Sequence, residues 1–289
     1  MTTADGVVPF GQRLRAAMAE RGPLCVGIDP HPSLLAGWGL PDDAHGLERF
    51  ALTCVEALAG RVAVLKPQSA FFERHGSAGV AVLERVLAEA PSSGCLTLLD
   101  AKRGDIGSTM DAYAQAYLGS GPLTADAVTL SPFLGYGSLR PAIDLALASG
   151  RGVFVLALTS NPEGASVQHA RGSDGRSVAA SVIEGAAADN TGAADAADDL
   201  GSVGLVVGAT VGSAVTDLGL DLAASRAPLL APGIGAQGAG PDELKQVFGE
   251  ARRNVLASSS RAVLAAGPSV AALREAAGRT VDQLAAALR

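Results

Sequence analysis

LLDAKRGDIGST, residues 98–109, is the stretch of this sequence that decides the fold. It starts as an apolar run, carries Asp100 and Lys102 two residues apart, and turns through Gly104 to Asp105. Residues two apart in a strand share one face, so an acid and an amine are expected to project together from one strand end. Charges at an apolar strand end cost free energy unless they are paired with an opposite charge or serve in binding or catalysis. The stretch is therefore either a salt-bridged strand end or part of a functional site.

Short apolar runs like this one recur along the chain, and each is followed by polar or Gly/Pro-rich residues. They occupy residues 24–30, 62–67, 96–102, 127–132, 152–160, 203–210, 227–233 and 254–261. The segments between them have helical spacing, as in GLERFALTCVEALAG. Nearly continuous apolar strands that alternate with helices indicate parallel strands covered by helices. Eight such units predict a closed (β/α)₈ TIM barrel in the α/β class, and no G-x-G-x-x-G follows the first run to favour a dinucleotide fold.

Two features modify this plan. A helix at 8–21 precedes the first strand and is expected to close the bottom of the barrel. The unit after strand five is longer than the others, and its extra residues, 161–201, predict an elaborated loop followed by a long helix. Because Gly, Ala, Ser and Asp dominate that segment, a disordered insertion is the alternative. We expect one barrel domain over residues 1–289, a length that this fold commonly reaches.

Composition narrows the function. The net charge of −7 without a basic block makes nucleic acid an unfavourable partner, and no apolar run is long enough to span a bilayer. Cys25, Cys54 and Cys95 lack metal-like spacing and are expected to be buried free thiols. The first residues do not resemble a secretory signal, so we expect a cytoplasmic protein. The scattered histidines do not suggest a structural metal site.

Polar residues follow several of the apolar runs, at the strand ends where this fold builds its active sites. They are Asp29, Lys66, Asp100, Lys102, Thr159, Ser160, Asn161, Gln237 and Arg261. After strand seven, PGIGAQG offers backbone amides that can approach an anion. Arg261, at the end of strand eight, can fork two hydrogen bonds to phosphate oxygens. These two strands predict a phosphate site, although PGIGAQG is also compatible with an ordinary turn.

DAKRGDIGST resembles the D-x-K-x-x-D element of the orotidine 5′-phosphate decarboxylase family. The first-strand VGIDP, the second-strand VLKPQSAFFE, the PGIGAQG turn and the eighth-strand Arg also resemble that family, so the similarity spans residues 24–261. The GIDPHP and KPQSAFFE forms, with the long fifth unit, are similar to its larger bacterial branch (type 2). The resemblance implies decarboxylation of orotidine 5′-monophosphate (OMP) to uridine 5′-monophosphate (UMP) and CO₂ in pyrimidine biosynthesis, without metal or cofactor.

The resemblance also implies a role for each matching residue. Lys102 would give a proton to C6 of the pyrimidine, with Asp100 beside the departing carboxylate. Asp29 and Lys66 would hold the ribose hydroxyls, and Ser160 would bind the pyrimidine edge. Gln237 and Arg261 would hold the phosphate. The resemblance further implies a homodimer with shared sites, in which the neighbouring subunit contributes residues of the turn after strand three: Asp105, Ile106 and Thr109.

Two other functions remain open at this point. D-x-K-x-x-D marks a wider suprafamily that includes metal-dependent sugar-phosphate decarboxylases or aldolases. Those relatives are expected to carry a metal-binding Glu at the end of strand two, where this chain has Lys66. A non-catalytic barrel that binds nucleotide phosphates would keep Gln237 and Arg261 but would not need the Asp100, Lys102 and Asp105 set.

Overall fold

Each apolar run of the sequence forms one strand of a closed parallel barrel. The computed structural model describes residues 6–191, 200–234 and 238–288. Within them the strands pair in chain order and the last pairs with the first, so the predicted (β/α)₈ TIM barrel is confirmed. The strands are β1 (Leu24–Ile28), β2 (Val64–Pro67), β3 (Leu96–Arg103), β4 (Ala127–Leu130), β5 (Gly152–Leu158), β6 (Val203–Val207), β7 (Leu229–Pro232) and β8 (Val255–Ser259).

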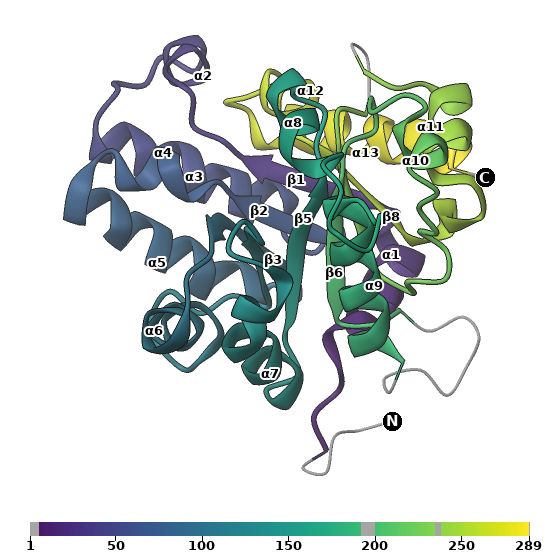
Figure 1. Ribbon diagram of the computed structural model, residues 1–289. Coiled ribbons are helices and arrows are strands. Elements are labelled where there is room, and N and C mark those ends of the chain that lie inside the picture. The colour runs from purple at the N-terminus through teal and green to yellow at the C-terminus, as the bar shows by residue number, and fades with distance from the viewer. Residues whose placement is uncertain (1–5, 192–199, 235–237, 289) are drawn as a thin grey trace.

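Helices surround the barrel, which is why the strands are apolar on both faces (Figure 1). The α-helices of the described residues are α1 (Phe10–Arg21), α2 (Pro32–Gly37), α3 (Ala44–Leu58), α4 (Ser69–Glu73), α5 (Gly76–Ser92), α6 (Gly107–Leu118), α7 (Arg140–Ala148), α8 (Ala165–Gln168), α9 (Val178–Asn190), α10 (Ala214–Asp217), α11 (Pro241–Phe248), α12 (Arg261–Leu264) and α13 (Val270–Ala287). Short 3₁₀ segments are η1 (Tyr136–Leu139), η2 (Pro162–Gly164) and η3 (Gly249–Asn254).

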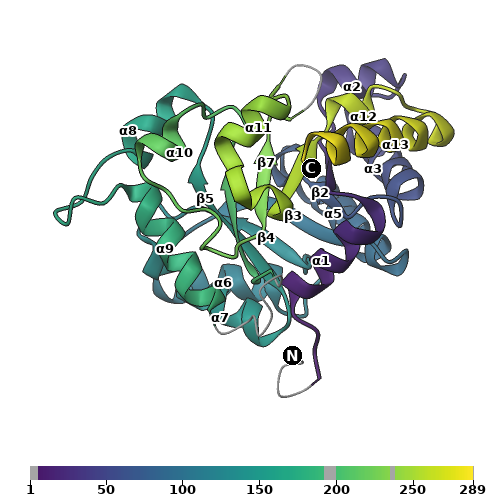
Figure 2. The ribbon, with the colours of Figure 1, turned by 90° about the vertical axis from the view of Figure 1, so that its right-hand side faces the viewer.

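The first helix, α1, closes the bottom of the barrel, as its place before β1 predicted. Phe10, Leu14 and Met18 of α1 join the apolar cluster formed by the inward side chains of the strands. The rings of Phe10 and Phe154 meet edge to face, 6.1 Å apart between centroids. Figure 2 shows α1 at the end of the barrel beside the N mark, opposite the end that carries α8 and α10. Ligands therefore have access from the other end, where the strands finish.

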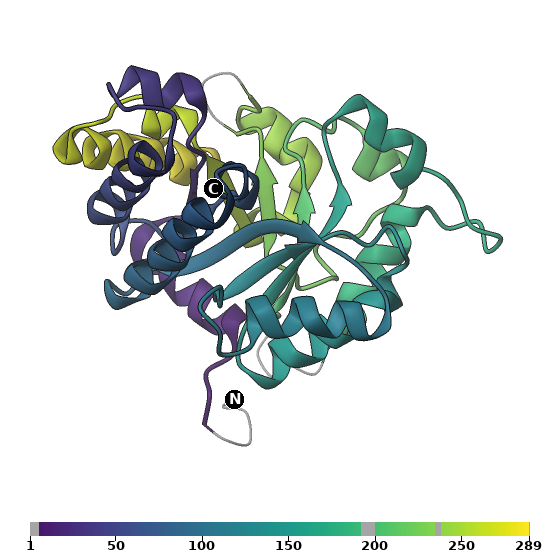
Figure 3. The same ribbon diagram turned by 90° about the vertical axis from the view of Figure 1, so that its left-hand side faces the viewer.

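A second apolar core lies between the strands and the outer helices. The C-terminal helix α13 packs against α3, so the last and the first units lie side by side (Figure 3). Trp38, which follows α2, packs against Phe50 of α3 with ring centroids 4.2 Å apart and the rings tilted by 39°. Its indole N–H donates to the carbonyl of Leu264 at 2.9 Å, which fixes α12 against the first unit.

The enlarged unit between β5 and β6 contains η2, α8 and α9, so the elaborated loop and long helix are confirmed over 161–191. The Ser177 hydroxyl accepts a hydrogen bond from Ala180 N and caps the start of α9. At its end, the buried Asn190 amide bonds to the backbone of Val203 and Ser225. Residues 192–199 lie outside the described residues, and the single-domain organisation stays a prediction.

All three cysteines are free and buried, as their apolar surroundings predicted. Burial raises the pKa of the Cys25 thiol to about 12 and that of Cys95 to about 11, so both are neutral at physiological pH. Among the helices that the structure describes, none is both long and apolar enough to cross a membrane.

Replacing Phe10 by Ala should destabilise the barrel, because the ring is fully buried and its removal leaves a cavity at the bottom. We expect a loss of about 3–5 kcal/mol in the free energy of unfolding, measured by urea denaturation. Val8→Ala, at a side chain that is 44% exposed just before α1, is the control and should cost less than about 0.5 kcal/mol. Equal losses in the two variants would contradict the role of α1 as the barrel's closure.

Candidate active site

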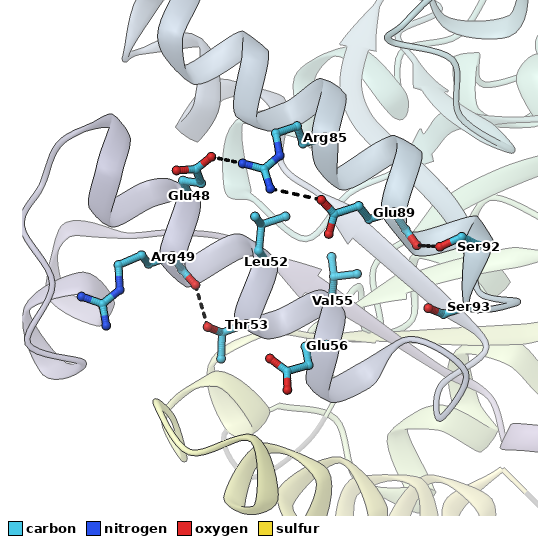
Figure 4. A pocket seen from close by; sticks show the side chains of 10 residues that line it. All are labelled: Glu48, Arg49, Leu52, Thr53, Val55, Glu56, Arg85, Glu89, Ser92 and Ser93. Carbon is cyan, nitrogen blue, oxygen red and sulfur yellow. Dashed lines mark hydrogen bonds and ion pairs between the residues drawn. The ribbon is translucent and has the colours of Figure 1, made fainter.

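A cavity of about 360 Å³ opens at the end of the barrel where the strands finish. It is lined by Asp29, Lys66, Gln68, Asp100, Lys102, Thr129, Leu156, Val206, Leu230, Pro232, Gly233, Ser258 and Ser260. A larger hollow of about 610 Å³ lies on the outer surface between α3 and α5 (Figure 4). Among its charged residues, Arg85 pairs with both Glu48 and Glu89. The acids and amines that face an interior cavity are in the barrel mouth, as expected for this fold.

The alternation of side chains along each strand places the polar lining. Leu98 on β3 and Val64 on β2 belong to the apolar cluster inside the barrel. Two residues further along these strands come Asp100 and Lys66, which line the cavity. In the same way, Thr129 of β4 follows the inward Ala127. Because the side-chain period of a strand is two, the residue two positions after each inward core residue points into the mouth of the barrel.

Asp100 is the centre of a hydrogen-bond network. Its Oδ2 accepts from Lys66 Nζ at 2.9 Å and from Gln68 Nε2 at 3.0 Å. Its Oδ1 accepts from Lys102 Nζ at 2.6 Å and from Thr129 Oγ1 at 2.9 Å. Asp100 and Lys66 are buried, whereas the Lys102 side chain is 46% exposed. The expectation that Asp100 and Lys102 project together is therefore correct, and the carboxylate holds one lysine on each oxygen.

The two lysines set the charge of this site. Burial alone would raise the pKa of Asp100, but the nearby Lys66 and Lys102 outweigh burial and hold it well below its usual range. Burial alone would lower the pKa of Lys66, but Asp100 and Asp29 raise it above its ordinary value. At neutral pH, Asp100 and Lys66 are therefore both charged despite being buried.

The backbone bends at Lys102, which a regular strand would not do. Lys102 has φ +47°, one of two non-glycine residues with positive φ in the described chain. This left-handed conformation costs roughly 1–2 kcal/mol for an L-residue and persists only where its surroundings hold it. Gly104 follows, and a Cβ there would lie 2.2 Å from the Ser131 carbonyl oxygen, so only glycine permits the loop after β3 to pass this close to the next loop.

Asp29 comes from the strand on the other side of Lys66. Its Oδ2 accepts from the Ser260 hydroxyl at 2.6 Å. Its Oδ1 is buried and has no hydrogen-bond donor among the described residues. A Cβ on Gly27 would lie 2.1 Å from Ser260 Oγ, so glycine at that position allows the hydroxyl to reach Asp29. A buried acceptor without a donor at a cavity wall is suited to a hydroxyl group of a ligand.

Of the candidate residues chosen from the sequence, the cavity brings together Asp29, Lys66, Asp100 and Lys102. Asp105 lies on the loop beyond, where its Oδ1 accepts from Ile106 N at 2.8 Å. Ile106 and Thr109 are exposed at and after the start of α6. None of these three lines the described cavity. Their roles, like those of all the candidate residues, stay predictions.

The placement of Arg261 as the end of strand eight is wrong. The ladders of β8 with β1 and β7 finish at Ser259 and Ser258, and Arg261 is the first residue of α12. On the side of β7, that strand already ends at Pro232, opposite Ser258. Arg261 is exposed at the rim and is not part of the cavity wall. Ser160, two residues after β5 ends, is also exposed and outside the wall.

The glycine-rich turn after β7 is described only in part. Gly233 lines the cavity with φ +88°, and its carbonyl accepts from Ala239 N at 2.8 Å. This hydrogen bond joins the described residues that precede and follow 235–237. Gln237 lies outside the described residues, so its predicted phosphate contact is not placed.

Sequence reasoning missed several polar residues of the cavity: Gln68, Thr129, Ser258 and Ser260. Ser258 and Ser260 stand on the same apolar run as Arg261, and Gln68 directly follows the run that contains Lys66. Thr129 stands on the run 127–132, which supplied no candidate residue. The signal was the period of two, because Gln68 follows Lys66 by two residues, and Ser258 and Ser260 follow the inward Leu256. Uncharged residues at a strand end are easily taken for ordinary strand or turn residues.

Comparison with known proteins decides the family. The sequence model of the "Orotidine 5'-phosphate decarboxylase / HUMPS family" matches residues 22–276. A protein of Streptomyces coelicolor named orotidine 5′-phosphate decarboxylase is 62% identical over 282 residues, which cover 97% of this chain and 98% of the relative. The chain belongs to the orotidine 5′-phosphate decarboxylase / HUMPS family. A Salinispora arenicola protein of the same name is 64% identical over 96% of this chain and 98% of its own length.

Solved structures of the family agree with this fold. A crystal structure from Streptomyces avermitilis, described as a candidate orotidine 5′-phosphate decarboxylase, has a TM-score of 0.91 at 61% identity and covers 98% of this chain and 96% of its own. The Leishmania donovani OMP decarboxylase has a TM-score of 0.73 at 32% identity, with coverage of 97% and 99%. The family's barrel is thus present over nearly the whole chain.

The charge network makes stability depend on acid pH. In the unfolded chain Asp100 has a pKa near 3.8, and its folded value is lower. Its contribution to stability is therefore complete above about pH 3.8 and is lost as the pH falls through the folded value. We expect the free energy of unfolding of the wild type to fall more steeply below pH 4 than that of Asp100→Asn, by up to about 1.4 kcal/mol per pH unit. Urea titrations at several pH values measure this.

The same variant should also be less stable at pH 7, by about 3–5 kcal/mol, because it leaves Lys66 buried without its carboxylate. Parallel pH dependences for the two proteins would show that Asp100 does not carry its charge as the network indicates.

Proposed function

We propose that the chain decarboxylates OMP to UMP and CO₂ in pyrimidine biosynthesis, using only its own side chains. The observation that carries this proposal is the Lys66–Asp100–Lys102 network, in which a partly exposed ammonium lies next to a buried carboxylate. Its support from known proteins is the name shared by relatives that are 55–64% identical over nearly the whole chain. The residue roles below extend that family function to the geometry of this site.

In the proposed reaction, the bond from C6 of the pyrimidine to its carboxylate breaks and CO₂ leaves. The electron pair stays on C6, where no adjacent carbonyl can accept it. Lys102 Nζ stabilises this charge and then gives its proton to C6, forming the C6–H bond of UMP. Solvent returns a proton to the lysine, which its exposure allows. Asp100 keeps the ammonium in place and faces the substrate carboxylate until CO₂ departs.

The rest of the cavity would hold the nucleotide. Asp29, with its donor-free Oδ1, would accept from a ribose hydroxyl, and Lys66 has further N–H groups for the same ribose. Gly233, Gln237 and Arg261 would bind the phosphate at the ends of strands seven and eight. Ser160 would contact the pyrimidine edge. Arg261 lies exposed at the rim, and a turn of its side chain toward the cavity would bring it to the phosphate.

The donor set does not fit the metal-dependent alternative. Lys66 stands where a metal-binding carboxylate would be needed, and its buried ammonium lies 2.9 Å from Asp100 Oδ2. A divalent cation bound by Asp100 would be repelled by two lysines. No group of three His, Cys, Asp or Glu suited to a metal was found in the part of the chain that the structure describes.

The site is completed by a second copy of the chain in this proposal. Ile106, Phe133 and Leu134 are 62%, 76% and 52% exposed, on the loops that follow the neighbouring strands β3 and β4. Ser131 N donates to Arg103 O at 2.7 Å, so the two loops are in contact at the rim of the cavity. Large apolar side chains at the surface favour an interface. A homodimer through this rim would cover them and would bring Asp105, Ile106 and Thr109 to the partner's site. We place the enzyme in the cytoplasm, where its thiols stay reduced.

The wild type should convert OMP to UMP, followed by ultraviolet absorbance, at the same rate with and without a chelator. Lys102→Ala should lower kcat by about 1,000-fold or more, because an ammonium ~4 Å from a developing charge contributes about 4 kcal/mol at an effective dielectric near 20. Lys245→Ala, which removes an exposed lysine on α11, is the matched control and should keep the wild-type rate. A Lys102→Ala enzyme with a tenth of the wild-type kcat would refute the proton-donor role.

Shared sites can be tested by mixing inactive chains. In a heterodimer of Asp105→Asn with Lys102→Ala, one of the two sites has both native residues, so part of the activity should return. Each variant alone should be inactive, and mass spectrometry should verify the heterodimer. Verified heterodimers without activity would show that Asp105 does not act across an interface.

A further inference from the structure

Thr129 is a buried residue of β4 that the proposed chemistry does not use. Its side chain is 1% exposed. The hydroxyl donates to Asp100 Oδ1 at 2.9 Å and accepts from the backbone N–H of Lys102, also at 2.9 Å. One hydroxyl therefore connects the carboxylate and the backbone of the lysine that this carboxylate holds.

The Lys102 backbone needs such a partner because the β3–β4 ladder is interrupted there. Leu99 pairs with Val128, and the next pair is Arg103 with Leu130. Four residue steps on β3 therefore match two steps on β4, and the extra residues form a bulge. Lys102 lies inside this bulge in the left-handed conformation, with φ +47°. The Thr129 hydroxyl accepts the N–H that a regular ladder would have paired with a carbonyl.

We propose that Thr129 is a positioning residue, whose hydroxyl fixes the bulged Lys102 backbone and thereby the direction of the Lys102 ammonium. The inference rests on the proposed function, since it concerns how the proton donor is aimed at the substrate. Asp100 alone restrains only the end of a flexible side chain with four carbons. Thr129 restrains the backbone of Lys102, so the lysine is held both at its backbone and at its ammonium group. A displacement of about 1 Å at a reacting group can cost about 100-fold in rate.

The chain contains a matched control at the opposite end of the barrel. Thr97 of β3 is also 1% exposed, and its hydroxyl donates to Asp126 Oδ2 at 3.0 Å. It accepts from the backbone N–H of Asp126 at 3.1 Å. Thr97 and Thr129 thus make the same two kinds of hydrogen bond on neighbouring strands, but Thr97 is remote from the cavity.

The test compares Thr129→Val, which keeps the shape without the hydroxyl, with Thr129→Ser, which keeps the hydroxyl, and with Thr97→Val. We expect kcat for OMP to fall about 100-fold in Thr129→Val. The affinity for UMP, measured by calorimetry, should stay near that of the wild type, because the proton donor is not needed to hold the product. Thr129→Ser should recover most of kcat. Thr97→Val should lower the melting temperature as Thr129→Val does, yet keep kcat. If Thr129→Val does not fold, Thr129→Ala replaces it in the comparison with Thr129→Ser.

Three results would overturn the inference: a Thr129→Val enzyme with wild-type kcat, a Thr129→Ser enzyme as slow as Thr129→Val, or an equal loss of kcat in Thr97→Val. The last would show that barrel stability, not positioning, sets the rate. A wild type that leaves OMP unchanged would overturn the proposed function and this inference together. A wild type that is active, combined with any of the three results, would overturn this inference alone.

Discussion

Asp100 keeps a negative charge inside the barrel because it lies between two ammonium groups, and the rest of the site depends on this arrangement. Moving a carboxylate out of water costs several kcal/mol, and only closely placed cations and hydrogen-bond donors offset that cost. Lys66 and Gln68 satisfy one oxygen, while Lys102 and Thr129 satisfy the other. Because Lys66 is buried and Lys102 is half exposed, one lysine maintains the charge of Asp100 and the other remains available to a substrate.

The closed barrel makes this arrangement possible. Lys66, Asp100 and Thr129 come from β2, β3 and β4, which are adjacent because the parallel strands pair in chain order. All their side chains point inward since each lies two residues beyond an inward apolar residue. The bottom of the barrel is filled by α1, so ligands must enter from the end where the strands finish. The apolar lower half thus supplies stability, while the polar upper half carries the chemistry.

The bulge in β3 interrupts the regular ladder at Lys102, the residue to which we assign the proton transfer. A regular β3 would have continued its ladder with β4 and left Lys102 in an ordinary extended conformation. Instead the strand takes up extra residues and Lys102 adopts a left-handed backbone, which the Thr129 hydroxyl and the close passage of Gly104 accommodate. Backbone strain of this kind persists where surrounding contacts over-determine the conformation. The loop that follows carries the exposed Ile106, and this places the strained strand end next to the surface that we propose a second chain covers.

The sequence alone determined the order of the elements, the closed barrel, and the placing of four charged residues, Asp29, Lys66, Asp100 and Lys102, at one end of it. It could do so because apolar strands with charged residues at their ends are local patterns in the sequence. It could not show that Gln68, Thr129 and Ser260 complete the site, since uncharged residues reveal their partners only when strands meet. It also misplaced Arg261, because the last residue of β8 depends on its pairing with β7, which stops at Pro232 opposite Ser258. The left-handed turn at Lys102 has no local signature, for lysine rarely adopts it unaided. Tertiary structure decided it, because the burial of Asp100 and the reach of Thr129 from the next strand exist only in the closed barrel.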